Sequence, residues 1–358
     1  MSRDPSEQRI SPTEGPTECE RASTGAGDRS MTDLRAAASA AGITAGDILD
    51  LEPLTGGTYN TVTGITLTDG RAWVLKTPPA HPTGLGYERD LLVNEATFYR
   101  AAADPRVPDV VRAQLAPAAT GGPYLLMTRC PGQPWTSVSD SLRAEERLRL
   151  RGELGGVVAG FHAVTGTDGF GYPAAPLGPL AATWREAFSA MTDAVLADAD
   201  AFGAWLPVPS ARVREVLAGA AYALDAVTRP ALVHFDLWGG NLLVDGEPGN
   251  RRLGGVVDGE RMFWGDPVAD FVSLALLGDL AEDTAFLTGY AAGGGDAEFT
   301  PSVRLRLALY SVYLYLIMLA EAVPRGYDAE QLGWLRAEVG PRLVAVLAEA
   351  EGATHTRA

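Results

Sequence analysis

The segment that decides the fold is LVHFDLWGGNLLVDGEPGNRRLGGVVDGERMFWGDPVADF, residues 232–271, a β-like island within a mostly helical second half of the chain. It sets His234, Asp236 and Asn241 in the pattern H-x-D-x-x-x-x-N, and an apolar run, GGVV, then leads to Asp258. The carboxylate of Asp236 is suited to receive or orient the proton of an attacking hydroxyl. The amide oxygen of Asn241 and the carboxylate of Asp258 are ligands that Mg2+ prefers. The joint spacing predicts a phosphoryl-transfer site rather than a chance pattern in an Asp-rich chain.

Lys76 is the only lysine in a chain that also holds 28 arginines. It ends the run VTGITLTDGRAWVLK, in which Asp69-Gly70 supplies the positive φ that a tight hairpin turn needs. The next segment has helical periodicity and places Glu95 on its apolar stripe. In protein kinases a third-strand lysine bridges two phosphates of the nucleotide and is held by a glutamate on the following helix. We therefore predict a Lys76–Glu95 pair, because a compact ammonium fits where a planar guanidinium is too wide; a surface lysine without function is the alternative.

The stretch LTGGTYNT, residues 54–61, lies upstream of Lys76 and can cover the phosphates. Gly56 and Gly57 allow backbone N–H groups to come close to a ligand, and Thr58 follows them. An ordinary tight turn would use the same residues, because the stretch lacks the G-x-G-x-x-G pattern. We predict nucleotide contacts at Gly56, Gly57 and Thr58.

The order of β-rich and helical segments predicts an α+β fold with two lobes, a small β-rich N-lobe and a larger, mostly helical C-lobe. A short helix is expected at residues 32–41, and two short strands are expected at 110–116 and 123–129. The stretch CPGQPW then links the lobes, because its Pro and Gly residues interrupt regular structure. We place the N-lobe at residues 31–129 and the C-lobe at residues 130–358.

Two further segments are defined by their composition. Residues 1–30 are rich in Ser, Thr, Pro, Glu and Gly and lack an apolar h-region, so they are expected to form a disordered tail rather than a signal peptide. Met31 offers a second start of translation. Residues 307–320 carry no charge but are too few to span a bilayer, so they are expected to form a buried core helix.

The formal net charge of -16 disfavours nucleic acid and anionic membranes as partners, because both are negatively charged. A cationic small substrate is compatible with this charge, as is an acidic soluble protein without a charged ligand. Cys19 and Cys130 form neither a disulfide framework nor a metal-ligand spacing. A reducing, cytoplasmic location is expected, and the oligomeric state is left open.

The chain resembles the aminoglycoside phosphotransferase and choline-kinase-like family, small-molecule kinases with a protein-kinase-like fold. The similarity begins at about Leu51 and is most specific in HFDLWGGNLL and VVDGERMFWGDPVADF. It implies that Asp236 is the catalytic base, that Asn241 and Asp258 bind Mg2+, and that ATP or GTP is the phosphoryl donor. It also implies that the connector between the lobes contacts the nucleobase through the backbone of Met127, Thr128, Arg129 and Cys130.

The same resemblance assigns residues around the metal ligand. Family members have Asp-x-Glu where protein kinases have Asp-Phe-Gly, and Glu260 completes this motif here. A Gly-Asp-Pro-x-x-Asp segment follows, in which Asp266 and Asp270 are expected to be structural. His234, two residues before Asp236, is expected to brace the catalytic loop.

The acceptor is expected to be a small molecule with a hydroxyl group. Only GERMFWG separates Asp258 from Asp266, which leaves no room for the activation segment on which protein kinases lay out a peptide. Charge and resemblance together favour a cationic or aminated acceptor, such as an aminoglycoside or another antibiotic. The candidate acceptor contacts are Trp184, Trp238, Glu260, Tyr310 and Glu321, with core packing as the alternative for the aromatic residues on helices.

Two alternative functions remain open at this point. Trp238 stands where many relatives have His, and DLWGGN resembles the Asp-Leu-Trp-Ser-Gly-Asn loop of ketosamine kinases, so a ketosamine (fructosamine)-type or choline-like metabolite kinase is one alternative. A non-catalytic nucleotide-binding pseudokinase is the alternative of another class. A decayed site normally loses at least one essential residue, so the presence of Lys76, Asp236, Asn241 and Asp258 favours an enzyme.

Overall fold

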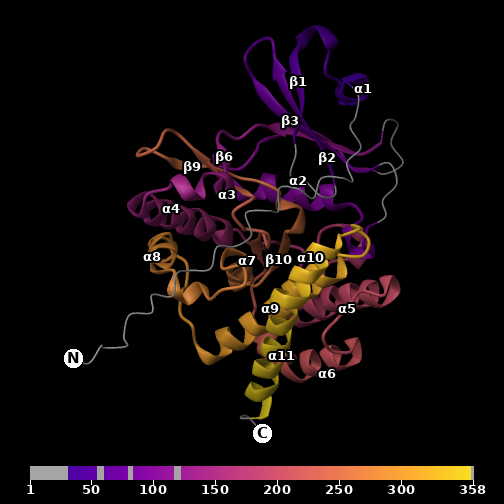
Figure 1. The fold of residues 1–358 in the computed structure, drawn as a ribbon, viewed down its shortest axis with the longest axis vertical. Helices are drawn as coiled ribbons and strands as arrows, with labels where there is room; N and C mark the ends of the chain where they lie inside the picture. The colour runs from indigo at the N-terminus through magenta and orange to yellow at the C-terminus, as the bar shows by residue number, and fades with distance from the viewer. Residues whose placement is uncertain (1–30, 55–59, 80–83, 117–121, 356–358) are drawn as a thin grey trace, which may run out of the picture.

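The computed structural model describes residues 31–54, 60–79, 84–116 and 122–355, and Figure 1 shows their arrangement. The first part of the chain forms an antiparallel sheet and the remainder is mostly helical, so the predicted α+β plan is confirmed. The predicted tail of residues 1–30 and the predicted phosphate-covering residues Gly56, Gly57 and Thr58 lie outside the described residues.

The N-lobe sheet has the strand order β1-β2-β3-β5-β4, and all neighbouring strands are antiparallel. Its strands are β1 (Ile48–Leu54), β2 (Thr61–Leu67), β3 (Ala72–Thr77), β4 (Val110–Gln114) and β5 (Tyr124–Thr128). β2 and β3 form the predicted hairpin, with Gly70 at a φ of 87° in the turn. Lys76 on β3 consequently lies between Val62 of β2 and Leu125 of β5, on the central strand of the sheet.

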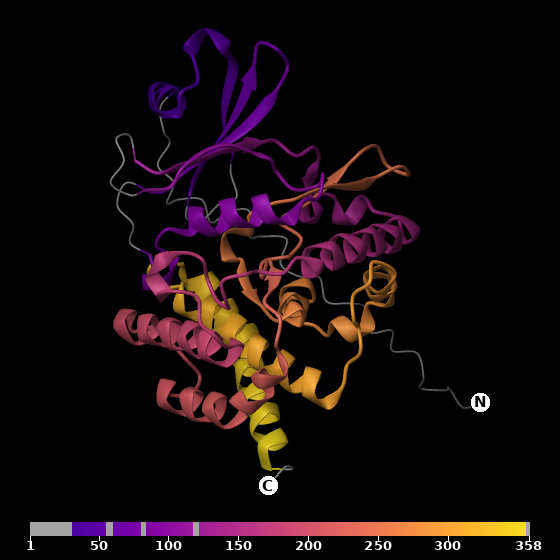
Figure 2. The same ribbon diagram turned by 180° about the vertical axis from the view of Figure 1, so that it is seen from behind.

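The two faces of this sheet are covered differently. Helix α1 (Met31–Ala40), predicted at residues 32–41, packs on one face with Leu75, whereas Val74 faces the main core, because successive side chains of a strand point to opposite faces. Helix α2 (Leu91–Ala102) lies beneath the sheet, between it and the C-lobe helices, in both Figure 1 and Figure 2. Glu95 on α2 is therefore placed under the strand that carries Lys76.

The C-lobe is built around helix α9, most of which is buried. By length and composition α9 could cross a membrane, yet 72% of its apolar window is buried inside the molecule, in agreement with the predicted core helix at residues 307–320. The helices of this lobe are α3 (Trp135–Val138), α4 (Ala144–Ala163), α5 (Trp184–Phe202), α6 (Ser210–Ala220), α7 (Asp270–Leu274), α8 (Thr284–Ala292), α9 (Pro301–Ala320), α10 (Ala329–Trp334) and α11 (Gly340–His355). A π-helical turn, Leu335–Val339, joins α10 to α11.

The predicted β-like island forms two small sheets between the N-lobe and these helices. Strand β7 (Ala231–Val233) pairs with β10 (Phe263–Gly265), and β8 (Leu242–Asp245) pairs with β9 (Arg252–Val256) and with β6 (Gln133–Pro134). The loop from β7 to β8 carries the H-x-D-x-x-x-x-N pattern, and the turn after β9 carries Asp258. Val257 N donates to Asn241 O at 3.0 Å, so the two loops lie side by side.

Candidate active site

Lys76 lies between two carboxylates below the N-lobe sheet. Its Nζ is 2.7 Å from Glu95 Oε1 and also contacts Asp258 Oδ1. Tyr99, one turn after Glu95 on α2, donates its hydroxyl to Glu95 Oε1 at 2.7 Å and accepts from Asp258 N at 2.9 Å. Lys76 and Glu95 are only 6% and 0% exposed. The structure therefore brings the predicted Lys76–Glu95 pair together with the predicted metal ligand Asp258, and a surface position for this lysine is excluded.

The charges of Lys76 and Asp258 stabilise each other. Burial alone would lower the pKa of Lys76, but Asp258 and Glu95 outweigh it and raise that pKa well above its ordinary value. Burial would likewise raise the pKa of Asp258, but the nearby Lys76 ammonium lowers it overall. Lys76 and Asp258 are consequently both ionised at neutral pH.

Lys76→Arg is expected to lower kcat/KM for MgATP turnover by about 10²-fold. Arginine keeps the positive charge, but its planar fork fills the space between Glu95 and Asp258 and is misplaced toward a phosphate. Steady-state kinetics and thermal unfolding would be compared with Arg71→Lys, an exposed arginine paired with Asp69 on the same hairpin. If Lys76→Arg and Arg71→Lys both kept the wild-type kcat/KM, the role predicted for Lys76 would be contradicted.

The loop that carries Asp236 is fixed by hydrogen bonds from its backbone to the buried carboxylate of Asp270. The buried Asp270 carboxylate accepts from His234 N at 3.1 Å and from Phe235 N at 2.5 Å. Phe235 has a φ of 62°, a left-handed conformation that a bulky residue adopts only when its surroundings impose it. His234 Nδ1 accepts from Asp236 N at 3.2 Å, and His234 Nε2 donates to Val257 O at 3.1 Å. His234 and Asp270 thus make bracing contacts, and burial lowers the pKa of His234 so that its ring is neutral.

The Asp236 carboxylate is positioned to accept a proton. Its side chain is 24% exposed, so a small hydroxyl compound can reach it. Oδ2 accepts from Asn241 Nδ2 at 3.0 Å and lies 3.9 Å from Arg261 Nε, whereas no hydrogen bond from another described residue reaches Oδ1. Burial raises the pKa of Asp236 to about 6, with Arg261 opposing this rise. At neutral pH the group is mostly ionised, and Oδ1 is left for an acceptor hydroxyl.

Asn241 and Asp258 fit the ligand chemistry of Mg2+. Asn241 Nδ2 donates to both the backbone oxygen and the Oδ2 atom of Asp236, which turns its amide oxygen away from Asp236. That oxygen and the Asp258 carboxylate are hard donors of the kind that Mg2+ takes. Carboxylate oxygens of Glu95, Asp258 and Glu260 also lie within 4.8 Å of one another. Among the described residues this is the group of acidic side chains dense enough for a metal ion, although Lys76 already neutralises part of it.

The connector between the lobes offers one free backbone donor among the four predicted positions. Met127 and Thr128 lie on β5, and the Met127 side chain is 3% exposed. Thr128 and Arg129 donate their N–H groups to backbone carbonyls of the N-lobe at 2.9 and 3.0 Å. No hydrogen bond between described residues uses the Cys130 N–H, and burial raises the pKa of the Cys130 thiol to about 11. The geometry thus favours the Cys130 amide over those of Thr128 and Arg129 as a donor to a nucleobase.

Trp238 lies partly exposed two residues after Asp236. Its indole ring covers Gly240, where an added Cβ would come within 2.3 Å of the ring. A glycine is therefore required at position 240 for Trp238 to adopt this position. An acceptor contact at Trp238 stays a prediction.

The two predicted acceptor carboxylates already have internal partners. Glu260 is 9% exposed and accepts from Asn60 Nδ2 at 2.7 Å, and burial together with the Asp258 charge raises its pKa to about 8. Glu321 accepts from Arg261 Nη2 at 2.9 Å and lies 3.1 Å from Arg325 Nη2. Glu260 is thus largely protonated at neutral pH and Glu321 is neutralised. Neither residue therefore offers an unbalanced negative charge to a cationic acceptor. This disagrees with the prediction that both contact such an acceptor through their charge.

Trp184 and Tyr310 are core residues, and the prediction that they contact the acceptor is wrong. Both side chains are 0% exposed. Trp184 stacks on Phe263 and donates from Nε1 to the Tyr310 hydroxyl at 2.7 Å, which in turn donates to Asp266 Oδ2 at 2.7 Å. Arg306 Nε also lies 2.6 Å from Asp266 Oδ2. These bonds satisfy every buried polar group of the two aromatic side chains, so Asp266 is structural and the aromatic stripe of α9 serves packing.

Tyr310→Phe is expected to lower the free energy of unfolding by about 1–3 kcal/mol, because it leaves Trp184 Nε1 and one Asp266 bond without a partner. Acceptor KM and kcat should remain within about twofold of wild type, since the residue lies in the core. Urea denaturation would be compared with Tyr315→Phe, a buried α9 tyrosine whose hydroxyl makes no hydrogen bond to another described residue. A raised acceptor KM with unchanged unfolding would restore Tyr310 as a ligand contact.

Three residues of the site were not predicted. Tyr99 had a usable signal, because it lies four residues after Glu95 and so on the same helical face. Asn60 bonds Glu260 from the opposite lobe, 200 positions away in sequence, and no local pattern marks it. Arg261 beside Asp236 carries no signal that distinguishes it from the other arginines.

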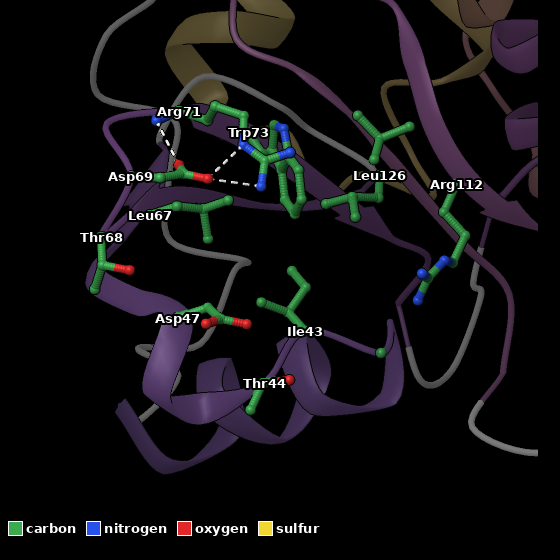
Figure 3. A pocket seen from close by; sticks show the side chains of 12 residues that line it. Ile43, Thr44, Asp47, Leu67, Thr68, Asp69, Arg71, Trp73, Arg112 and Leu126 are labelled. Atoms are coloured by element: carbon green, nitrogen blue, oxygen red, sulfur yellow. Dashed lines mark hydrogen bonds and ion pairs between the residues drawn. The ribbon is translucent and has the colours of Figure 1, made fainter.

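Two cavities lie away from these residues. One, of about 280 Å3, is on the N-lobe between the α1–β1 connection and the β2–β3 hairpin, where Asp69 pairs with Arg71 beside Trp73 (Figure 3). The other, of about 590 Å3, lies between α4 and the segment from α7 to α8, and Leu237 and Gly239 of the loop that carries Asp236 line it. Neither includes a predicted site residue, so the predicted centre is defined by the side-chain constellation rather than by either of these cavities.

Comparisons with known proteins identify the family of the chain. Residues 50–309 match the model of the family described as "Phosphotransferase enzyme family". No curated protein matches the chain. The family match covers both the Lys76 strand and the loops of Asp236 and Asp258.

Three solved structures illustrate the similarity in fold. The first is a mutant aminoglycoside phosphotransferase APH(4)-Ia with AMP-PNP and hygromycin B, at 20% identity and TM-score 0.58 over 86% of this chain and 97% of that one. The second is from Thermobifida fusca and is named as a candidate fructosamine-3-kinase, at 21% identity and TM-score 0.61 over 87% and 98%. The third is macrolide 2'-phosphotransferase MphH from Brachybacterium faecium, at 20% identity and TM-score 0.53 over 87% and 97%. The predicted bilobal, protein-kinase-like fold is thereby confirmed.

Proposed function

The chain belongs to the phosphotransferase enzyme family, and from this premise we propose that it transfers the γ-phosphoryl group of ATP to a hydroxyl of a small, aminated molecule such as an aminoglycoside or another antibiotic. The observation that carries the proposal is the convergence of Lys76, Glu95 and Asp258 from three separate elements, beside the loop that holds Asp236 and Asn241. A protein that only bound nucleotide would have no use for an ionised, partly exposed Asp236 beside that centre.

The proton of the acceptor is assigned to Asp236. Its Oδ2 is engaged by Asn241, so Oδ1 is the oxygen that receives the hydroxyl proton as the acceptor oxygen bonds to the γ-phosphorus and the bond from that phosphorus to the departing ADP breaks. His234 and Asp270 hold the loop backbone, which keeps the carboxylate from turning away. Accurate placement is the main contribution that this kind of reaction requires of the protein.

The phosphate side is assigned to Lys76, with Glu95 and Tyr99 fixing its ammonium group. In the loaded enzyme this group would pass from Asp258 to the phosphates, which frees the Asp258 carboxylate. Asn241 Oδ1 and Asp258 would then hold Mg2+, which when bound balances the phosphate charge and orients the γ-phosphoryl group. The Cys130 N–H is the proposed donor to the adenine ring.

The class of acceptor rests on charge and on the relatives. Solved structures of similar fold include enzymes named for aminoglycosides and macrolides, one of them in complex with hygromycin B. The net charge of -16 favours approach of cations, although Glu260 and Glu321 do not supply a free charge at the site itself. An aminated acceptor is therefore expected to be attracted mainly by the long-range field of the whole negatively charged protein. Its apparent affinity should weaken as the salt concentration rises, because salt screens this attraction.

A ketosamine-type or choline-like metabolite kinase is the second candidate. Trp238 in DLWGGN favours it, because a partly exposed indole two residues after Asp236 is of the kind that contacts a sugar ring or a cationic head group. The two candidates share donor, base and metal ligands and differ only in the acceptor.

A screen of ADP formation tests the proposal and separates the candidates. Purified protein with Mg2+ and ATP, and in parallel GTP, would be incubated with aminoglycosides, macrolides, fructosamines and choline-like alcohols at low and high salt. Salt-sensitive turnover with an aminated antibiotic is expected. Turnover confined to fructosamines or choline would favour the second candidate, and nucleotide binding without turnover in any class would support a pseudokinase.

A further inference from the structure

A buried ion network joins three distant parts of the chain beside the catalytic loop. It consists of Glu88, Arg261, Glu321 and Arg325, and we call these four residues the ion network. Arg325 Nη2 is 2.7 Å from Glu88 Oε1 and 3.1 Å from Glu321 Oε2, and Arg261 Nη2 is 2.9 Å from the same Glu321 oxygen. The side chains are 2–14% exposed. Two carboxylates and two guanidinium groups thus neutralise one another away from solvent.

The four members come from three parts of the chain, two of which also carry residues of the candidate active site. Glu88 lies three residues before α2, the helix of Glu95. Arg261 ends the turn that begins at Asp258, and Glu321 and Arg325 follow the end of α9. The carboxylates that hold Arg261 therefore come from outside its own loop, and breaking a buried pair of this kind is costly.

Arg261 is the member of the ion network that reaches the catalytic base. Its Nε lies 3.9 Å from Asp236 Oδ2, the same oxygen that accepts from Asn241, while its Nη2 is held by Glu321. A planar guanidinium presents donors in fixed directions, so the anchor on Glu321 also fixes where Nε points. Asp236 Oδ2 is thus hydrogen-bonded by Asn241 and lies within ion-pair distance of Arg261.

We propose that Arg261 is a positioning residue for the transfer reaction, which holds the Asp236 carboxylate so that Oδ1 faces the acceptor hydroxyl. The inference rests on the proposed function, because it gives Arg261 its role through Asp236. Arg261 pairs with Glu321 and lies within ion-pair distance of Asp236, whereas Lys76 is bonded by Glu95 and Asp258. Loss of Arg261 should therefore reduce kcat by a larger factor than it raises the KM for ATP.

The experiment compares Arg261→Met with Arg306→Met. Arg306 is a matched control, because its side chain is also 11% exposed and pairs with a buried aspartate, Asp266, but it has no described contact with Asp236. MgATP turnover would be measured with water as acceptor and with any acceptor that the screen returns, together with thermal unfolding. We expect Arg261→Met to lower kcat by about 10- to 100-fold with the KM for ATP within twofold, and Arg306→Met to lower only the unfolding temperature.

Two further variants keep the test decisive if Arg261→Met does not fold. Arg261→Lys keeps the charge without the fork and should lose an intermediate amount of kcat, and Glu321→Gln should weaken the anchor of Arg261 with the same kcat-selective effect. Wild-type kcat in both of these variants would overturn the inference, as would equal kinetics in Arg261→Met and Arg306→Met. In either case, turnover by the wild-type protein would still support the proposed function. A wild-type protein inactive with water and with every acceptor would instead contradict the proposed function.

Discussion

Asp236→Asn is expected to lower kcat by about 10³-fold while the affinity for ATP stays near that of the wild type. An amide oxygen in place of Oδ2 can still accept from Asn241, so the loop should keep its geometry. The amide cannot take the proton of the acceptor hydroxyl, which is the contribution assigned to this residue. The Lys76 centre makes no hydrogen bond to Asp236 among the described residues, so nucleotide binding should persist. Single-turnover kinetics and equilibrium binding of ATP would measure the two effects separately.

The pH profile gives this prediction a second readout. Burial raises the pKa of Asp236 to about 6, so wild-type kcat should fall as the pH drops below about 6 and the carboxylate becomes protonated. The residual activity of Asp236→Asn should lack this acidic limb. Asp245→Asn, which alters an aspartate paired with the exposed Arg252 on the same island, serves as the control and should behave as wild type. A parallel loss of ATP binding in Asp236→Asn would show that the residue belongs to the nucleotide site instead.

Asp258→Asn is expected to lower kcat by about 10³-fold and to move the Mg2+ dependence to higher concentration. Asp258 has a φ of 65°, a left-handed conformation that Asn tolerates better than Ala, so this substitution removes the charge without straining the turn. The carboxylate is the assigned charged ligand of Mg2+, and a neutral amide balances less of the phosphate charge. Titration of activity with Mg2+ at saturating ATP would measure the shift.

The two aspartate variants serve as controls for each other. Asp236→Asn should keep the wild-type Mg2+ midpoint, whereas Asp258→Asn should not, because only Asp258 is assigned to the metal. The melting temperature of Asp258→Asn should fall below that of the wild type, because Lys76 loses one of its two carboxylate partners, but the fold should survive because Lys76 keeps its bond to Glu95. A wild-type Mg2+ midpoint in Asp258→Asn would mean that the metal is held by other groups, such as Glu95 or Glu260.

Local chemistry accounts for the parts of the fold and site that could be predicted. Asp69-Gly70 specifies a tight turn by itself, and the hairpin then fixes the register that brings Lys76 to the centre of the sheet. Glu95 could be placed because helical periodicity puts it on the buried face of α2. The loop of Asp236 was recognisable because its chemistry requires particular residues at fixed spacing.

The remaining parts depend on long-range packing that no local pattern encodes. The helical spacing of Trp184 and Tyr310 is the same whether these residues line a ligand site or pack in the core. Their hydrogen bonds to each other and to Asp266 place them in the core, and these bonds depend on the folded structure. Glu260 was expected to carry a charge, but burial raises its pKa. The hydrogen bond that it accepts comes from Asn60 in the opposite lobe, which no local pattern indicates. Arg261 gains its place from carboxylates elsewhere in the chain.

Transfer of the γ-phosphoryl group itself is the measurement that tests the central claim most directly. The acceptor identified by the screen would be incubated with γ-labelled ATP and Mg2+, and the small-molecule fraction would be separated and analysed by mass spectrometry. The wild-type protein is predicted to place the label on the acceptor as a single phosphate ester, in equal amount to the ADP formed, and Asp236→Asn is predicted to place almost none. Label found only in free phosphate, or equal labelling by Asp236→Asn, would contradict the account.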